Sequence, residues 1–125
     1  MEFIAKFAYA GVDGEVMMAG LADEEFDTRD YVLFRRSCHP GAADVALGHD
    51  RIHTEIGPNE GSAYGGIKSI ELFSDYLKVE VELNAARSLG TGPELLVRFD
   101  PNLESIAQVA GMLERIAGDL FADRR

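Results

Sequence analysis

The chain has 125 residues, with 22 acidic against 12 basic side chains, and a formal net charge of −10 at neutral pH. This balance argues against partners that are nucleic acids or anionic membranes, because both need clustered lysine and arginine. It suits a cationic protein partner, whose approach it would accelerate by long-range attraction, and it also suits plain solubility. The length is that of one ordinary domain, so we expect a single domain over residues 1–125.

Two further features predict where the protein resides. The first residues, Met1 to Lys6, show no basic region followed by an uninterrupted apolar block, and no apolar stretch approaches the ~20 residues that cross a bilayer. The one cysteine, Cys38, cannot form an internal disulfide. Together these observations predict a cytoplasmic protein.

The first third of the chain predicts strands. Residues 2–9 alternate in the period-two pattern of a strand. Residues 16–22 form a short apolar run, as in a strand that is buried on both faces. Residues 31–36 are rich in β-branched and aromatic side chains, which favours a third strand.

The next segment is less regular. Residues 42–47 predict at most a short helix that ends at Gly48. Residues 51–56 alternate as in a short strand, and the glycine, proline and asparagine that follow predict a loop over residues 57–62. Glycines in Ser62 to Gly66 predict a bend or bulge where the next strand begins, because a phosphate loop would instead need a helix and a lysine after it.

The second half carries the strongest pattern, a hairpin with arms at residues 66–73 and 76–83. Apolar and charged side chains alternate strictly in the second arm, as in a sheet with one solvated face. Residues 84–89 predict a short helix that Gly90 ends, and residues 94–99 predict another strand.

A final amphipathic helix is predicted to cover the sheet. Asp100 is a good N-cap, and Pro101 would occupy the first helical position. Apolar side chains then recur at helical spacing: Leu103, Ile106, Ala110, Leu113, Ala117 and Leu120. The elements together predict an α+β fold, in which a mainly antiparallel sheet of about six to seven strands packs on this C-terminal helix beside a short helix or two.

The densest cluster of charge lies in residues 23–31, where five carboxylates and two aromatic rings separate two predicted strands. Calcium loops space their ligands around a central glycine, which this run lacks. Rings and carboxylates together suit a binding surface for a basic protein. Alternatively, the run is a solvated connection in which Phe26 anchors the loop on the core and Tyr31 begins the next strand. The candidate partner-binding residues are Asp23, Glu24, Glu25, Phe26, Asp27, Asp30, Tyr31 and, at the glycine-rich bend, Tyr64.

Other reactive side chains do not form a convincing site. His49 and His53 have the spacing of two ligands on a helix, but the segment looks extended and zinc needs three or four ligands. Cys38 and His39 are adjacent, so in an extended segment they point to opposite faces. We therefore expect no metal, no cofactor and no enzymatic activity.

Several segments, in this order, resemble the immunity protein 10 family of bacterial polymorphic toxin systems. These are residues 20–28, 31–35, 64–67, 70–72 and 95–100. The resemblance implies a small cytoplasmic protein, a monomer or homodimer, that binds and neutralises a cognate toxin. Its negative charge favours a basic toxin domain as the partner.

Two alternatives from other classes stay open. The first is a self-associating structural or regulatory module without a toxin partner, because the chain has more apolar strand positions than one helix need cover, among them Phe3, Ile4, Phe7, Tyr9 and Met17. The second is an enzyme that depends on a metal or a small ligand.

Overall fold

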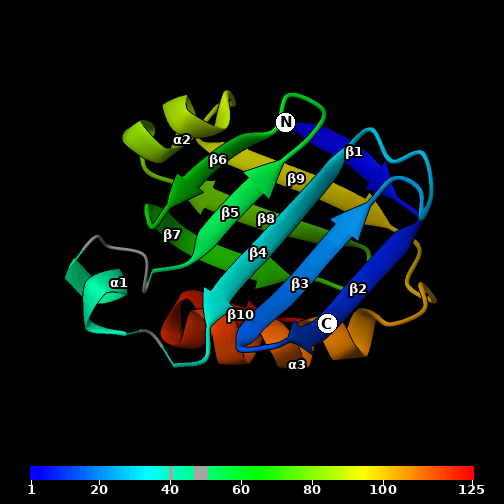
Figure 1. Ribbon diagram of the computed structural model, residues 1–125. Coiled ribbons are helices and arrows are strands. Elements are labelled where there is room, and N and C mark those ends of the chain that lie inside the picture. The colour runs from blue at the N-terminus through cyan, green and yellow to red at the C-terminus, as the bar shows by residue number, and fades with distance from the viewer. Residues whose placement is uncertain (40, 47–50) are drawn as a thin grey trace.

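Two five-stranded β-sheets form the body of the protein (Figure 1). The computed structural model describes residues 1–39, 41–46 and 51–125. Sheet A contains, in spatial order, β1 (Glu2–Ala5), β9 (Glu94–Phe99), β8 (Tyr76–Val81), β7 (Ile67–Leu72) and β10 (Phe121–Asp123). Sheet B contains β2 (Phe7–Asp13), β3 (Val16–Ala22), β4 (Tyr31–Ser37), β5 (His53–Ile56) and β6 (Gly61–Tyr64).

The two sheets differ in strand direction. Sheet B is antiparallel throughout. Sheet A is mixed, because its edge strands β1 and β10 run parallel to β9 and β7. The predicted α+β class is confirmed, but the strands that the sequence assigned to one sheet are divided between two.

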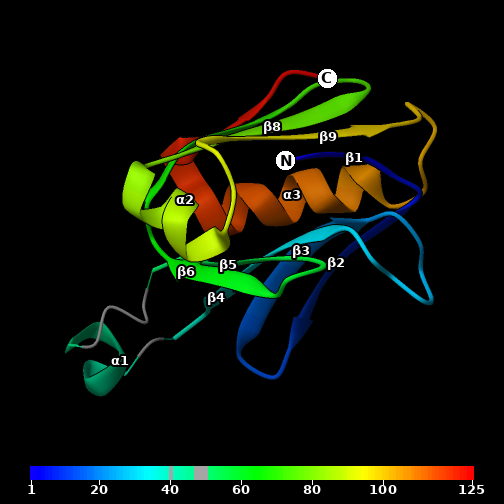
Figure 2. The ribbon, with the colours of Figure 1, turned by 90° about the horizontal axis from the view of Figure 1, so that it is seen from above.

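Helices close the space between the sheets. Figure 2 shows α3 (Ile106–Ala117) between the two sheet layers, where it packs on β2, β3, β4 and β10. The shorter α2 (Leu83–Leu89) packs on β5 and β6, and α1 (Ala42–Ala46) follows β4. A 3₁₀ turn, η1 (Gly118–Leu120), connects α3 to β10. Within residues 1–39, 41–46 and 51–125, no helix has the length and apolar character that a bilayer crossing requires.

One hydrophobic core joins the sheets and α3. Phe34 of sheet B, Leu77 of sheet A and Ile116 of α3 are at most 1% exposed and belong to the same cluster. Burial of this kind contributes roughly 1.5–3 kcal/mol per large apolar side chain, so the core accounts for much of the stability. The inner face of sheet B therefore packs on this core and on α3. None of the described helices or strands covers its outer face.

The first predicted strand is in fact two strands in different sheets. The chain leaves sheet A at Lys6, whose backbone N–H donates to the carbonyl of Ala22 at 2.9 Å, and continues as β2 of sheet B. The crossover reverses which side of the chain faces the core. Phe3 is consequently buried, whereas Phe7 lies on the outer face of sheet B and is only partly covered.

The final helix begins later than predicted. Asp100 is not its N-cap, because the Asp100 carboxylate accepts the backbone N–H of Asn102 at 2.8 Å and forms a turn. The helix starts at Ile106, after Ser105 with a φ of 72°. The predicted apolar stripe from Ile106 to Ala117 is buried, but Leu120 lies beyond the helix and is exposed.

Several local predictions are confirmed. The hairpin consists of β7 and β8, joined by a loop in which Phe73 N–H donates to the carbonyl of Tyr76 at 2.8 Å. Gly90 ends α2 in the left-handed conformation, with a φ of 73°. Gly65 and Gly66 have φ values of 69° and 77° and form the bend before β7.

One boundary prediction and one burial prediction are wrong, and a second boundary cannot be compared. The predicted loop over residues 57–62 ends early, because β6 begins at Gly61. The outer face of β3 is not buried along its length, because the outward-facing Val16, Met18 and Gly20 are exposed or only partly buried, although Ala22 on the same face is buried. The expected helix end at Gly48 lies outside the described residues.

Candidate functional site

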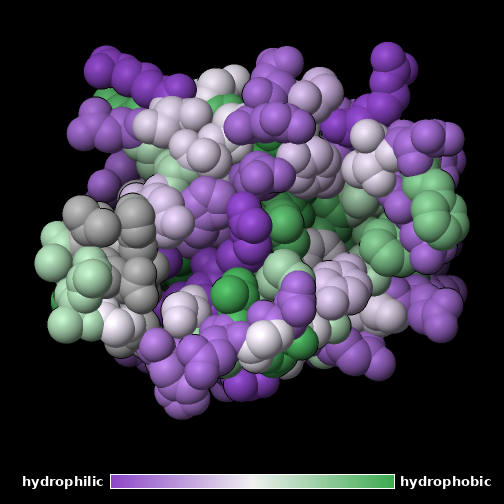
Figure 3. All heavy atoms as spheres, viewed as in Figure 1, coloured by the Kyte–Doolittle hydropathy of each residue, from purple (hydrophilic) through white to green (hydrophobic). Residues whose placement is uncertain are grey.

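The outer faces of the two sheets differ in chemistry. Sheet A carries ion pairs on its outer face: Arg98 of β9 with Glu2 of β1 at 2.9 Å, Lys78 of β8 with Glu94 of β9 at 3.8 Å, and Arg124, just after β10, with Glu71 of β7 at 2.6 Å. Such pairs are typical of a solvated face. The outer face of sheet B instead carries aromatic and aliphatic side chains, and Figure 3, which looks onto it, shows hydrophobic surface in a hollow among polar residues.

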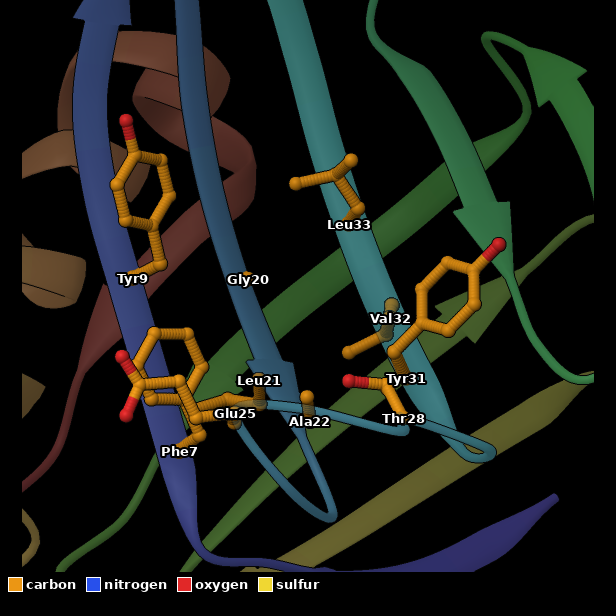
Figure 4. Close-up of a pocket in the computed structure, with 10 residues that line it drawn as sticks. All are labelled: Phe7, Tyr9, Gly20, Leu21, Ala22, Glu25, Thr28, Tyr31, Val32 and Leu33. Atoms are coloured by element: carbon orange, nitrogen blue, oxygen red, sulfur yellow. The ribbon is translucent and has the colours of Figure 1, made fainter.

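The hollow follows from the register of three strands. Phe7, Ala22 and Tyr31 form one row across β2, β3 and β4. Tyr9, Gly20 and Leu33 form the next. In both rows a small residue of the central strand lies between two large ones, so a groove of about 310 Å³ runs along β3 (Figure 4).

The groove is closed at one end and bordered by the acidic loop, residues 23–30, at the other. In the third row Met18 occupies the central strand, so the small-residue floor stops there. At the other end Glu25 and Thr28, from the loop between β3 and β4, line the groove. The Glu25 carboxylate points away from β3, past the Phe7 ring, so the channel itself is short and almost entirely apolar (Figure 4).

Tyr31 forms one wall of the groove in a fixed position. Its hydroxyl donates to a Glu55 carboxylate oxygen at 2.5 Å. Its ring lies against Gly57, where a Cβ atom would overlap the ring. Burial, the hydrogen bond to Glu55 and the negative charge of Glu55 raise the pKa of Tyr31 to about 12.

This pKa predicts a loss of stability in alkali. The unfolded chain releases the Tyr31 proton near pH 10, whereas the folded chain holds it to about 12. The stabilising contribution is therefore complete below pH 10 and disappears as the pH rises to about 12. We expect Tyr31→Phe to flatten the free energy of unfolding over that interval, measured by urea denaturation at each pH. Glu55→Gln should lower the pKa of Tyr31, and an unchanged phenolate absorbance titration would contradict this account.

The acidic loop, residues 23–30, has an ordered backbone. Asp23 N–H donates to the carbonyl of Asp30 at 2.9 Å, and the Asp23 carboxylate accepts the N–H of Arg29 at 3.1 Å. The Thr28 hydroxyl donates to the carbonyl of Glu24 at 2.6 Å. These bonds close the loop at its base and hold its tip away from the core.

The structure divides the predicted site residues of this loop by role. Asp23 and Asp30 shape its base, and Tyr31 begins β4, as predicted. Phe26 does not anchor the loop, because it is 78% exposed. The loop presents six consecutive residues to solvent, 24–29, which include the predicted site residues Glu24, Glu25, Phe26 and Asp27.

Tyr64 lies on the same outer face but not beside the acidic loop. It shares a row with Arg35 and His53, and its ring centroid is 4.6 Å from that of His53. Arg35 contacts His53 Nδ1 at 3.1 Å and Glu55 at 3.4 Å. A second pocket here is lined by several basic side chains, among them Arg36 and Arg51. The outer face is thus acidic at one end and basic at the other.

The metal and thiol candidates gain no support from this geometry. Among the described residues, no group of three or more His, Cys, Asp and Glu side chains is placed to hold a metal ion. His49, half of the predicted histidine pair, lies outside them. Cys38 is partly buried, while the adjacent His39 is exposed.

The sequence did not identify the residues that make the groove. In the sequence alone, Phe7 and Tyr9 belong to an excess of apolar strand positions, and Gly20 and Leu33 look like ordinary strand residues. The available signal was a pair of small residues, Gly20 and Ala22, spaced two apart in an apolar strand.

An ordered acidic loop beside an apolar groove on an uncovered sheet face is typical of a protein that binds another protein. A family model described as Immunity protein 10 matches residues 4–107. The chain therefore belongs to the immunity protein 10 family, as the sequence resemblance predicted, and this family implies toxin neutralisation by an inhibitor that is not an enzyme. Comparisons with curated proteins and with solved structures gave no match.

Proposed function

We propose that the protein binds a cognate toxin domain and neutralises it as a stoichiometric inhibitor in the cytoplasm of the cell that produces both. Family membership supports the general function. The partner in this proposal is a basic toxin domain, because the protein carries a net charge of −10.

The observation that carries the proposal is the tip of the acidic loop. Glu24, Glu25 and Asp27 are exposed around Phe26, whose ring is 78% exposed on a backbone tied at its base. An exposed ring offers area to bury, and the surrounding carboxylates can pair with arginine or lysine. Toxins that act on nucleic acid need basic surfaces, so an acidic loop could occupy them directly.

Neutralisation can be tested with any toxin domain that a gene neighbouring the one for this chain encodes. We expect cells that express the toxin domain to stop growing, and cells that also express this protein to recover. The purified proteins should form an equimolar complex by light scattering. Undiminished toxicity at equal expression, together with a homodimer that buries the groove, would contradict the proposal and favour the self-associating module.

A further inference from the structure

We infer that the basic end of the outer face of sheet B binds a carboxylate side chain of the toxin domain, in the pocket that Arg35, Arg51 and His53 line. This inference rests on the proposed function and specifies a second contact, opposite in charge to the acidic loop. The toxin domain accordingly carries an aspartate or glutamate beside the basic surface that meets the loop.

The pocket has more positive charge than its own carboxylate neutralises. Its volume is about 410 Å³, and three arginines line it: Arg35, Arg36 and Arg51. Arg35 pairs with Glu55 at 3.4 Å, whereas no carboxylate among the described residues forms an ion pair with Arg51. Neighbouring guanidinium groups repel one another, and a carboxylate that accepts hydrogen bonds from them relieves the repulsion.

The basic side chains are held in place by their neighbours. Arg35 Nη2 lies 3.1 Å from His53 Nδ1, and the His53 ring packs against Tyr64 in the same row. Arg51 lies against the bend at Gly65, where a Cβ atom would come within 2.9 Å of Arg51 Cδ. A pocket whose side chains are already positioned loses less entropy when it binds a charged group.

The charge of the whole protein favours the toxin over free anions as the source of the carboxylate. The net charge of −10 repels a small anion from the protein as a whole. A toxin domain that is attracted to the acidic loop brings its own carboxylates close to the pocket, at a high effective concentration.

Strand β4 sets the spacing of the two charged contacts (Figure 1). It begins at Tyr31, beside the acidic loop, and reaches Arg35 two rows later, a separation of ~14 Å along the strand. A toxin domain turned end for end on this face would place its basic surface against Arg35 and Arg51. The two opposite charges therefore select one orientation of the partner.

Arg51→Gln distinguishes this contact from general attraction, because the two predict changes of opposite sign. The variant is one charge more negative than the native protein, so long-range attraction alone would tighten its complex with a basic toxin domain. We expect the complex to weaken instead, with dissociation about 10-fold faster and association unchanged or slightly faster. Stopped-flow mixing measures the association rate, and a chase with unlabelled protein measures the dissociation rate.

Arg87→Gln is the matched control for this variant. It removes the same charge from an exposed position in the last turn of α2, and Arg87 does not line the pocket. Its complex should dissociate within about twofold of the native rate. If the Arg51→Gln complex dissociated no faster than the Arg87→Gln complex, the inference would be overturned and the proposed function would stand.

Toxin variants identify the carboxylate. Each aspartate and glutamate of the toxin domain is replaced in turn by asparagine or glutamine. One replacement should couple with Arg51→Gln in a double-mutant cycle, by about 5- to 10-fold in affinity. Neutralisation by a complex in which no toxin carboxylate couples with Arg51 would overturn the inference alone.

The protein without its toxin tests the other occupants of the pocket. We expect N-acetyl-glutamate amide to give saturable NMR shifts at the backbone amides of Arg35, His53 and Tyr64, with a dissociation constant on the order of 10 millimolar. Equal shifts from the neutral N-acetyl-glutamine amide would overturn the assignment of an anion. A dimer that Arg51→Gln dissociates would assign the pocket to the acidic loop of a second copy and overturn the toxin as the source. Saturable glutamate binding by a protein that does not bind the toxin would overturn the proposed function, and the toxin as the source with it.

Discussion

Replacing Glu24, Glu25 and Asp27 by Gln, Gln and Asn should slow association with the toxin domain about 10- to 100-fold at low salt. All three side chains are exposed in the acidic loop, so their charge acts on the partner before contact. The salt dependence of the association rate should flatten as well, because screening has less attraction to remove. Stopped-flow fluorescence across a series of salt concentrations would measure both effects.

Asp23 is kept in this variant for a structural reason. Its carboxylate accepts the backbone N–H of Arg29, so replacing it would change the shape of the loop along with its charge. The matched control replaces Glu82, Glu104 and Glu114 by Gln, which removes the same charge from exposed positions outside the loop. If the control slowed association as much, net charge rather than the acidic loop would be responsible, and the loop would lose its proposed role.

Periodic segments of the fold were predictable because their signals are local. The β7–β8 hairpin, β9 and the buried stripe of α3 each show a period that depends on near neighbours in sequence. The division into two sheets was not predictable in this way. It depends on β1 pairing with β9, more than half the chain away, while the local alternation runs on through Lys6.

The candidate site was predictable only in its charged part. Carboxylate density marks residues 23–30 in the sequence, and Tyr64, a candidate binding residue by sequence, is 47% exposed in the structure. The groove could be predicted only from the register of the strands. Gly20 forms part of the groove floor because Tyr9 and Leu33 flank it on the neighbouring strands. The sequence also gave no sign that Tyr64 belongs to the basic end of the face, because that follows from its pairing with His53.

Helix α2 packs on sheet B and supports the end of the sheet where Tyr64 and the basic side chains lie. Strand β6, which carries Tyr64, is an edge strand and packs on α2. Gly61 makes the approach possible, because a Cβ atom there would overlap the Leu89 carbonyl oxygen and lie 2.6 Å from its carbonyl carbon. The obstacle is backbone, so no side-chain rotation relieves it.

Gly61→Ala should therefore lower the free energy of unfolding by about 3 kcal/mol, the upper part of the usual range for overpacking. Gly111→Ala, on the exposed side of α3, is the matched control with the opposite sign. No atom lies within 4 Å of a Cβ there, and alanine in a helix interior is favoured over glycine by about 1 kcal/mol. Urea denaturation of both variants measures the two effects on one scale. A stable Gly61→Ala protein would mean that β6 and α2 are not in close contact, and the basic end of the face would then lack the support that α2 gives it.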